Sequence, residues 1–309
     1  MTGIVILNYN TPSDVILCID SVYKYTSQDF KIYIVDNCST DDSYQILSNK
    51  YSNDNNVVLI KSEYNGGFSA GNNIGIKRAI EDGAEYVCVS NPDILLLNDA
   101  IAESIKIFES DKTIGIVCPV IQTPDDSIES QVARKKLSLK DYLLEKLHLN
   151  KLSKRYIKED NFNEDFIFSG MGSGCFYVAR TDFFVRAHYL DESVFLFGEE
   201  DIMVYKLEKM GYMTCITPKA EVFHNHHKSI AKTSPANRIF HLRLSPLVVL
   251  RKYAGISKIT LFFLIMINNF AWLMKSIFNK DFRKKFKGYV NSNKKIFSYK
   301  KREGLENVN

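Results

Sequence analysis

The sequence is poor in cysteine and holds no closely spaced cysteine pair. Six cysteines are scattered over 309 residues, most of them beside apolar residues, and none forms a C-x-x-C motif. Paired spacings are typical of zinc ribbons and redox motifs, whereas disulfide scaffolds carry cysteines at high density in short chains. We therefore expect buried thiols in a reducing compartment, and neither a disulfide framework nor a zinc framework.

Several other signatures are also missing. The glycines follow neither the dinucleotide-binding nor the P-loop spacing, and no H-E-x-x-H pair accompanies the histidines. The most apolar stretch, 256–274, has an unbroken apolar core of only residues 261–267, whereas a spanning helix needs roughly 18 apolar residues. The apolar segment 4–7 is too short, and too uncharged before it, for an export peptide. We therefore expect the newly made protein to be in the cytosol.

Acidic residues are scarce at one end of the chain. Residues 1–250 hold 26 basic and 33 acidic residues, a net charge of −7, whereas residues 251–309 hold 14 basic and 3 acidic residues, a net charge of +11. Such a split predicts a contact with an anionic partner that is confined to the tail. We divide the chain accordingly into a domain over 1–250 and a basic, amphipathic helical tail over 251–309.

The pattern of the domain predicts an α/β fold. Short β-branched runs alternate with stretches of helical spacing, which indicates a Rossmann-like, mostly parallel sheet flanked by helices. The segment at about 122–165 breaks this pattern and is richly charged, so we interpret it as an insertion that serves as a lid or an acceptor-binding element. The five expected strands are 4–7, 31–35, 57–60, 86–90 and 114–118.

Polar residues or glycines follow four successive strands. In open α/β sheets ligands bind beyond the carboxyl ends of the strands, so these residues predict a nucleotide-binding edge. Asp36 suits hydrogen bonding to the imide N–H of uracil or thymine, and the glycines after Asn65 suit close approach to a diphosphate. Ordinary turn chemistry remains an alternative explanation for both. The candidates are Asn8, Asn10, Asp36, Asn65, Gly67, Asn91 and Asp93.

Two further clusters suit chemistry on a bound diphosphate. Asp93 lies on a rigid Asn-Pro-Asp turn and could bind Mg²⁺ or Mn²⁺ through oxygen, although the same turn is common without a metal. The acids at 199–201 open a helix, where the macrodipole alone favours them, but one of them could act as a general base. The segment 222–229 holds three histidines, and spacing does not tell which of His224, His226 and His227 contacts the metal or the diphosphate.

Taken in order, these motifs resemble an inverting glycosyltransferase of family 2 with the GT-A fold, in its rhamnosyltransferase-like branch. The likeness covers residues from about 3 to about 253, and although each motif is weak alone, their common order is specific. The motifs are Leu7-Asn-Tyr-Asn10, Val35-Asp-Asn-Cys-Ser-Thr-Asp41, Asn65-Gly-Gly-Phe68 with Gly71-Asn-Asn-Ile-Gly75, Asn91-Pro-Asp93, Gly172-Ser-Gly174, Glu200-Asp201, and His224 with Ser229.

The resemblance implies a role for each matching position. Asp93 and His224 would hold Mn²⁺ or Mg²⁺, and Asp201, in one motif with Glu200, would be the catalytic base. The first position of the family's Asp-x-Asp motif is Asn91 here, which leaves more of the metal coordination to the diphosphate. The remaining candidates would bind the donor nucleotide: Asn8, Asn10, Asp36, Asn65, Gly67 and Asn91.

The implied reaction moves a sugar, rhamnose among the candidates, from a dTDP- or UDP-sugar to a hydroxyl of a glycan or lipid-linked acceptor in bacterial surface polysaccharide synthesis. A nucleotidyltransferase is the nearest alternative, but it would need a basic, Gly-rich loop after the first strand, and residues 8–12 carry no cation. An inactive sugar-binding or scaffolding subunit is the other alternative. The presence of Asp36, Asp93 and Asp201 together argues against it.

The tail combines an apolar face with cations. Its apolar residues fall at helical spacing, and a lone Trp272 and flanking lysines accompany them, as in helices that lie in an anionic membrane surface. We predict such binding through 256–302, at the inner face of the plasma membrane. Packing on the body or in a homodimer is the second interpretation, and no recognition motif favours nucleic acid. The apolar positions are Ile256, Ile259, Phe263, Ile267, Phe270, Met274 and Ile277.

Overall fold

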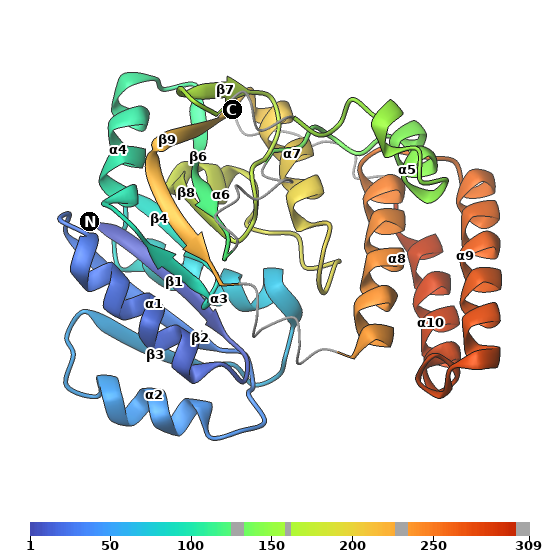
Figure 1. The fold of residues 1–309 in the computed structure, drawn as a ribbon, viewed down its shortest axis with the longest axis horizontal. Coiled ribbons are helices and arrows are strands. Elements are labelled where there is room, and N and C mark those ends of the chain that lie inside the picture. The colour runs from blue at the N-terminus through green and yellow to red at the C-terminus, as the bar shows by residue number, and fades with distance from the viewer. Residues whose placement is uncertain (125–132, 158–161, 226–233, 301–309) are drawn as a thin grey trace.

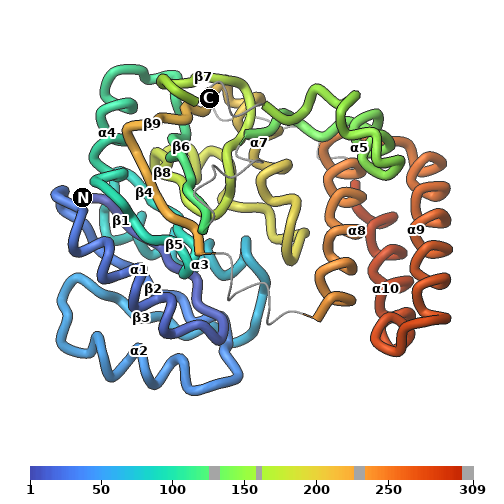
Figure 2. Tube along the Cα trace, viewed as in Figure 1, coloured from blue at the N-terminus to red at the C-terminus, as the bar shows by residue number. Residues whose placement is uncertain are grey.

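The computed structural model describes residues 1–124, 133–157, 162–225 and 234–300. Figure 1 shows a sheet covered by helices on both faces, with a helical bundle standing to one side of it. The tube view in Figure 2 follows the same path from the N-terminal sheet through the bundle.

The first four strands form the parallel half of the sheet, in the order β3-β2-β1-β4. Each of the five segments that the sequence predicts as a strand lies in an observed strand, since the run 114–118 belongs to β6. The β-branched residues of β1, β2, β4 and β6 are buried on both faces, as central strands of α/β sheets require, whereas those of the edge strand β3 are half-buried. The bounds are β1 Thr2–Asn8, β2 Phe30–Asp36, β3 Val57–Lys61, β4 Tyr86–Ser90 and β6 Ile114–Gln122.

The rest of the sheet is mixed. β8 lies between β4 and β6 and runs antiparallel to both, while β6 and β9 are parallel. The short strands β5 and β7 both pair antiparallel with β9. The carboxyl end of β9 therefore lies at the same edge as those of β1, β2 and β4. The bounds are β5 Ile94–Leu96, β7 Phe166–Phe168, β8 Phe176–Arg180 and β9 Met213–His224.

Alternation along each strand divides the core in two. Ile4 and Ile6 point into the layer formed with α1, α2 and α4, whereas Val5 points into the layer formed with α3, α6 and α7. No disulfide joins the six cysteines, all of which lie in the described residues, and five of them are buried. The helices are α1 Pro12–Tyr25, α2 Ser43–Tyr51, α3 Gly67–Glu81, α4 Ala100–Ser110, α6 Thr181–Arg186 and α7 Glu199–Met210.

The described part of the insertion lies between the sheet and the bundle. Arg134 pairs through its backbone with Met171 in both directions, at 2.9 Å each. Ser138 and Asp141 then form a capping box that begins α5, Leu139–Lys146, and a single 3₁₀ turn, Asn150–Leu152, follows it. The buried Tyr142 of α5 accepts a hydrogen bond from Asn268 at 2.8 Å, which ties the insertion to the bundle.

The tail forms the outer part of a three-helix bundle made of α8, Pro235–Lys252, α9, Lys258–Phe278, and α10, Lys280–Ser298 (Figure 1). The predicted boundary between residues 250 and 251 falls inside α8. Trp272 is 0% exposed, stacks on Tyr289 at 4.2 Å and donates its Nε1–H to Phe282 O at 3.0 Å. The prediction of Trp272 as a membrane-surface residue is therefore wrong, because its ring fills the bundle core.

Candidate active site

A hydrogen-bond network joins the carboxyl ends of β1 and β2. Asn8 donates its Nδ2–H to Asp36 Oδ1 at 2.7 Å, and Ser39 Oγ donates to the same oxygen at 2.6 Å. The Ser39 N–H also reaches Asp36 Oδ2 at 3.1 Å. With 1% of its surface exposed, Asp36 is a fixed acceptor that closes this turn. Both interpretations of Asp36 remain compatible with this geometry, and its contact with a base stays a prediction.

Asn10 links the same two loops on their outer side. Its Oδ1 accepts the N–H of Thr40 at 2.8 Å, and its own N–H donates to Ser39 Oγ at 3.0 Å. Asn10 and Cys38 both have positive φ, 59° each, a conformation that asparagine tolerates better than most residues. The two loops are thus held as one rigid unit at the sheet edge.

The glycine-rich loop makes its close approach to protein backbone. Gly67 has φ +85°, and a Cβ there would lie 2.2 Å from Phe195 O. Phe68 N–H donates to that same oxygen at 2.9 Å. Asn65 Oδ1 accepts the N–H of Gly67 at 3.0 Å and a side-chain hydrogen of Asn37 at 3.1 Å. Gly67 therefore serves packing against the segment before α7, and donor binding by Asn65 and Gly67 stays a prediction.

Asp93 and His224 converge, as the sequence predicts for a metal site. Asp93 Oδ1 lies 3.4 Å from His224 Nε2, and both residues are buried. Asp93 is brought there by the turn between β4 and β5, because β5 pairs with β9 and sets Ile94 opposite His224. Asn225 N–H donates to Asp93 O at 3.0 Å and fixes the turn.

The chemistry of this pair fits a divalent cation. Mg²⁺ and Mn²⁺ commonly take one or two protein ligands and complete their coordination with water and substrate phosphate oxygens. Asp93 and His224 supply one oxygen and one nitrogen, and the described residues contain no group of three or more potential ligands. His226 and His227 lie outside the described residues.

Glu200 lies beside the turn that carries Asn91. The N–H of Asn91 donates to Cys175 O at 2.7 Å, and the preceding Gly174 donates its N–H to Glu200 Oε1 at 3.4 Å. Arg134 Nη2 lies 3.7 Å from the same oxygen. The contacts of Asn91, Cys175, Gly174 and Glu200 are continuous, so Glu200 belongs to the same edge of the sheet as Asp93.

Asp201 faces in another direction. Its carboxylate forms an ion pair with the Arg155 guanidinium, and both side chains are almost fully buried. Arg155 also contacts Glu145 at 2.7 Å and Lys135 O at 3.2 Å, so Asp201 is joined to the insertion. The role of Asp201 as base stays a prediction, and the contacts favour Glu200 for it.

Glu199 lies in an apolar setting at the start of α7. Burial raises the pKa of its carboxyl above the usual range, and the charge of Glu200 adds to the effect. Burial likewise raises the pKa of the Tyr177 phenol, which these two acids raise further. The first turn of α7 therefore holds three acids in three different environments, which spacing alone does not distinguish.

The bundle supports the loop before α7. Ser245 of α8 donates its Oγ–H to Leu196 O at 2.9 Å, and His241 stacks on Phe195 at 4.9 Å and 21°. Burial, together with the charge of the nearby Lys285, lowers the pKa of His241 to about 4. Since Phe195 contacts Gly67, α8 is joined through one loop to the strand-end residues.

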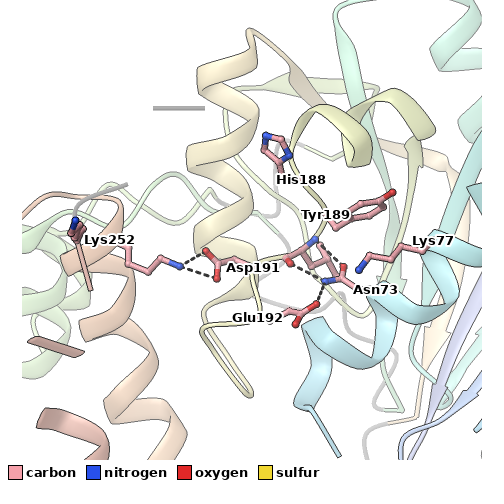
Figure 3. A pocket seen from close by; sticks show the side chains of 9 residues that line it. Asn73, Lys77, His188, Tyr189, Asp191, Glu192 and Lys252 are labelled. Carbon is pink, nitrogen blue, oxygen red and sulfur yellow. Dashed lines mark hydrogen bonds and ion pairs between the residues drawn. The ribbon is translucent and has the colours of Figure 1, made fainter. Parts of the chain in front are cut away.

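A second connection lies around a cavity of about 470 Å³ between α3, the turn 188–192 and the end of α8 (Figure 3). Lys252 reaches both Asp191 oxygens, at 2.7 and 3.0 Å, and Asn73 binds Leu190 and Glu192 on the other side. Burial raises the pKa of Asp191, but hydrogen bonds from Lys252, Ser193 and Tyr253 outweigh it and hold that pKa well below its usual range. Sequence reasoning missed this anchor and Arg155, because their partners are distant in sequence.

More than half of the chain matches the model of a known protein family. A family model described as "Glycosyl transferase family 2" matches residues 3–183. Among curated proteins, glycosyltransferase GlyG of Streptococcus pneumoniae serotype 4 is 28% identical over 117 residues, which cover 37% of this chain and 38% of that protein. The chain thus matches well under half the length of this relative.

Solved structures show a similar fold. The structure of GalNAc-T7 with UDP, GalNAc and Mn²⁺ has a TM-score of 0.58 and 16% identity, covering 79% of this chain and 48% of that one. The mannosyltransferase PcManGT of Pyrobaculum calidifontis, in complex with GDP-Man and Mn²⁺, has a TM-score of 0.54 and 14% identity. It covers 95% of this chain and 85% of that chain, so the resemblance extends into the C-terminal helices.

Proposed function

Because the chain belongs to glycosyl transferase family 2, whose model matches residues 3–183, we propose that its strand-end residues transfer a sugar from a nucleoside-diphosphate donor to a hydroxyl acceptor. The observation that carries the proposal is the convergence of Asp93 and His224 beside the turn that leads through Cys175 to Glu200. A cation site and a general base then lie at one edge of the sheet. The expected family, fold class and enzyme class are confirmed, and the fold is of the GT-A type.

The donor is a nucleoside-diphosphate sugar. The two structural neighbours were solved with UDP or GDP-Man, and the Asn8–Asp36–Ser39 network offers a fixed polar rim for a base. dTDP- and UDP-sugars are the first candidates, because Asp36 suits an imide N–H, and dTDP-rhamnose follows from the resemblance to the rhamnosyltransferase-like branch. A GDP-sugar is the contrast that the donor assay must include.

Asp93 and His224 would hold Mn²⁺ or Mg²⁺ together with the donor diphosphate. Such an ion stabilises the negative charge that develops on the leaving diphosphate. Both structural neighbours were crystallised with Mn²⁺, which supports a divalent ion and leaves its identity open. The Asn225 N–H fixes the backbone of Asp93, and the pairing of β5 with β9 fixes that of His224, so the backbone that carries both side chains is set before any ion binds.

Glu200 acts as the general base in this proposal. It removes the proton from the acceptor hydroxyl, whose oxygen forms a bond to the anomeric carbon. The bond from that carbon to the diphosphate oxygen breaks with its electron pair, and the nucleoside diphosphate leaves from the opposite face. The anomeric configuration inverts. Asp201 is bound to the insertion through Arg155. As the neighbouring acid, it serves as the control position for substitutions of Glu200.

The acceptor is proposed to be a glycan or a lipid-linked sugar in the synthesis of a bacterial surface polysaccharide. The support is the resemblance to that branch and a bundle that adjoins the loop before α7 through His241 and Ser245. A lipid-linked acceptor would place the enzyme at the inner face of the plasma membrane, as a peripheral protein.

A donor panel tests the proposal. Purified protein is incubated with dTDP-, UDP- and GDP-sugars, with Mn²⁺ or with EDTA, and the release of nucleoside diphosphate is measured. We expect release from one nucleotide class, dependent on the divalent ion and greatly reduced in Asp93→Asn. Release of pyrophosphate from a nucleoside triphosphate and a sugar phosphate would instead indicate a nucleotidyltransferase. Nucleotide binding without turnover of any donor or acceptor would indicate a binding subunit.

A further inference from the structure

Helix α9 presents a long apolar face to solvent. Its exposed positions recur at intervals of three and four residues, which places them along one side of the helix. With 21 residues, α9 is roughly 30 Å long at 1.5 Å per residue, and the exposed face runs along all of it. We call it the α9 outer face. It comprises Ile259, Phe262, Phe263, Met266, Ile267, Phe270, Leu273, Met274, Ile277 and Phe278, which are 42–86% exposed.

The opposite side of α9 is fully engaged. Leu261, Leu264 and Ile265 are buried against α8 and α10, and Trp272 closes the other end of the bundle. Six of the seven predicted apolar positions lie on the α9 outer face, whereas Ile256 is buried in the bundle. The α9 outer face therefore makes no contribution to the core of the bundle.

The α9 outer face is large enough to indicate a binding site. Ten large apolar side chains, half or more exposed in most cases, form one continuous stripe on a helix at the outer edge of the molecule (Figure 1). Soluble proteins rarely expose contiguous apolar patches beyond a few hundred Å², and larger ones mark sites of interaction with proteins or membranes.

The charges around the face point to an anionic partner. Exposed Lys258 and Lys275 flank the stripe on α9 itself, and Lys280 begins α10 directly after it. Residues 258–300 contain ten basic residues and a single acid, Asp281. Exposed cations on α10 add to this charge: Arg283, Lys284, Lys287, Lys294 and Lys295.

We propose that the α9 outer face docks the protein onto an anionic lipid bilayer, with α9 lying in the plane of the headgroups. Amphipathic helices with an apolar side and flanking lysines bind in this way, the apolar side entering the boundary between headgroups and acyl chains. The inference stands on the outer face and its charges, independently of the proposed reaction.

α9 is long and apolar enough to cross a membrane by length and composition, but a third of its 18-residue window is buried in the bundle. Insertion across the bilayer would withdraw Trp272 from its stack on Tyr289 and Asn268 from its hydrogen bond to Tyr142. It would also remove α9 from its packing against α10, a helix that carries many cations. A helix lying in the surface keeps all these contacts.

A second copy of the chain fits the charges less well. A symmetric contact through the α9 outer face would bring the same surface of both copies together. Lysines at the ends of the face, Lys258, Lys275 and Lys280, would then approach lysines of the other copy, and like charges destabilise such a contact. Lipid phosphates supply the opposite charge along the whole face.

Docking would also orient the catalytic domain. α8 packs against α9 and α10 in the bundle, and it contacts the loop before α7 through His241 and Ser245. The bilayer contact is thus connected to the segment that leads to Glu199 and Glu200 by one helix and one loop.

The test is co-sedimentation of the full-length protein with vesicles of phosphatidylcholine alone or mixed with phosphatidylglycerol. We expect binding to the mixed vesicles, at least about tenfold weaker binding to phosphatidylcholine, and weakening by salt. The variant Phe263→Gln/Ile267→Gln/Phe270→Gln should lose about tenfold or more of the binding, because it removes the apolar contact. Lys280→Gln/Lys284→Gln/Lys287→Gln should lose the preference for the anionic lipid.

Leu152→Gln/Val185→Gln is the matched control, since it replaces exposed apolar side chains outside the bundle. It should bind like the unmodified protein, and all variants should keep the same thermal midpoint and circular dichroism spectrum. Undiminished vesicle binding by the triple apolar variant would overturn the proposal. So would a dimer in sedimentation equilibrium that the same variant abolishes without any lipid binding, or membrane association that alkaline carbonate fails to release.

Discussion

The ion pair between Arg155 and Asp201 is expected to anchor the insertion, and its removal should destabilise the fold. Both side chains are almost fully buried, and breaking a buried pair by removing one partner costs roughly 3–5 kcal/mol. Glu145 stays 2.7 Å from Arg155 in Asp201→Asn and shares its charge, so we expect the free energy of unfolding to fall by about 2–3 kcal/mol. Donor turnover should survive in this variant.

Urea unfolding of a double-mutant cycle measures this energy. Arg155→Met and Asp201→Leu should each cost more than their combination does, because the double variant leaves no buried charge of this pair without its partner. We expect a coupling energy of at least about 1 kcal/mol in the free energy of unfolding. Single variants that cost less than about 1 kcal/mol and add independently would refute the anchoring role.

Three further predictions follow from the contacts of the site and the bundle. Because the pKa of His241 is lowered by folding, the unfolded chain binds a proton at His241 between about pH 6.5 and 4, whereas the folded chain does not. The free energy of unfolding should therefore decrease as the pH is lowered from about 6.5 to 4, by about 1–2 kcal/mol after allowance for partial exposure. His241→Phe keeps the stack on Phe195 and should flatten that slope in urea titrations, and an unchanged slope would contradict the assignment. Asp93→Asn should weaken Mn²⁺-dependent UDP binding in calorimetry by about tenfold or more while leaving metal-free binding intact, and an equal loss without metal would argue against a metal role. Lys252→Met removes the cationic partner of the buried Asp191 carboxylate and should lower the free energy of unfolding by about 2–3 kcal/mol, a loss that Asp191→Asn in the same chain should partly restore.

The strands and helices of the sheet could be predicted because their signal is local. Nearly continuous apolar, β-branched runs such as 4–7 and 31–35 carry their signal within a few residues, and each lies in a strand of the buried sheet. The antiparallel direction of β8, and its position between β4 and β6, could not be predicted, because they depend on the path that the insertion takes before β8. Trp272 was misplaced for a related reason: helical spacing does not tell which side of a helix meets its neighbours.

The candidate site was predicted in its composition more than in its orientation. Asp93 and His224 converge because a short strand, β5, pairs with β9, which the sequence hints at only through the adjacent turn residues. The different contacts of Glu200 and Asp201 could not be read from the sequence, because neighbours in the first turn of a helix point about 100° apart. Asp201 points toward Arg155, with which it forms an ion pair. This pairing could not be predicted, because the segment around Arg155 shows only a run of charged residues in the sequence.

The assignment of Glu200 as the general base is tested most directly by comparing Glu200→Gln with Asp201→Asn in one assay of donor turnover. Release of nucleoside diphosphate is measured with the donor that the panel identifies, and UDP or dTDP binding is measured in parallel by calorimetry. We expect Glu200→Gln to bind nucleotide normally but to turn over about 10²–10⁴-fold more slowly, whereas Asp201→Asn should keep turnover within about tenfold. The reverse pattern, with Glu200→Gln active and Asp201→Asn inactive at a temperature where both variants are fully folded, would contradict this assignment.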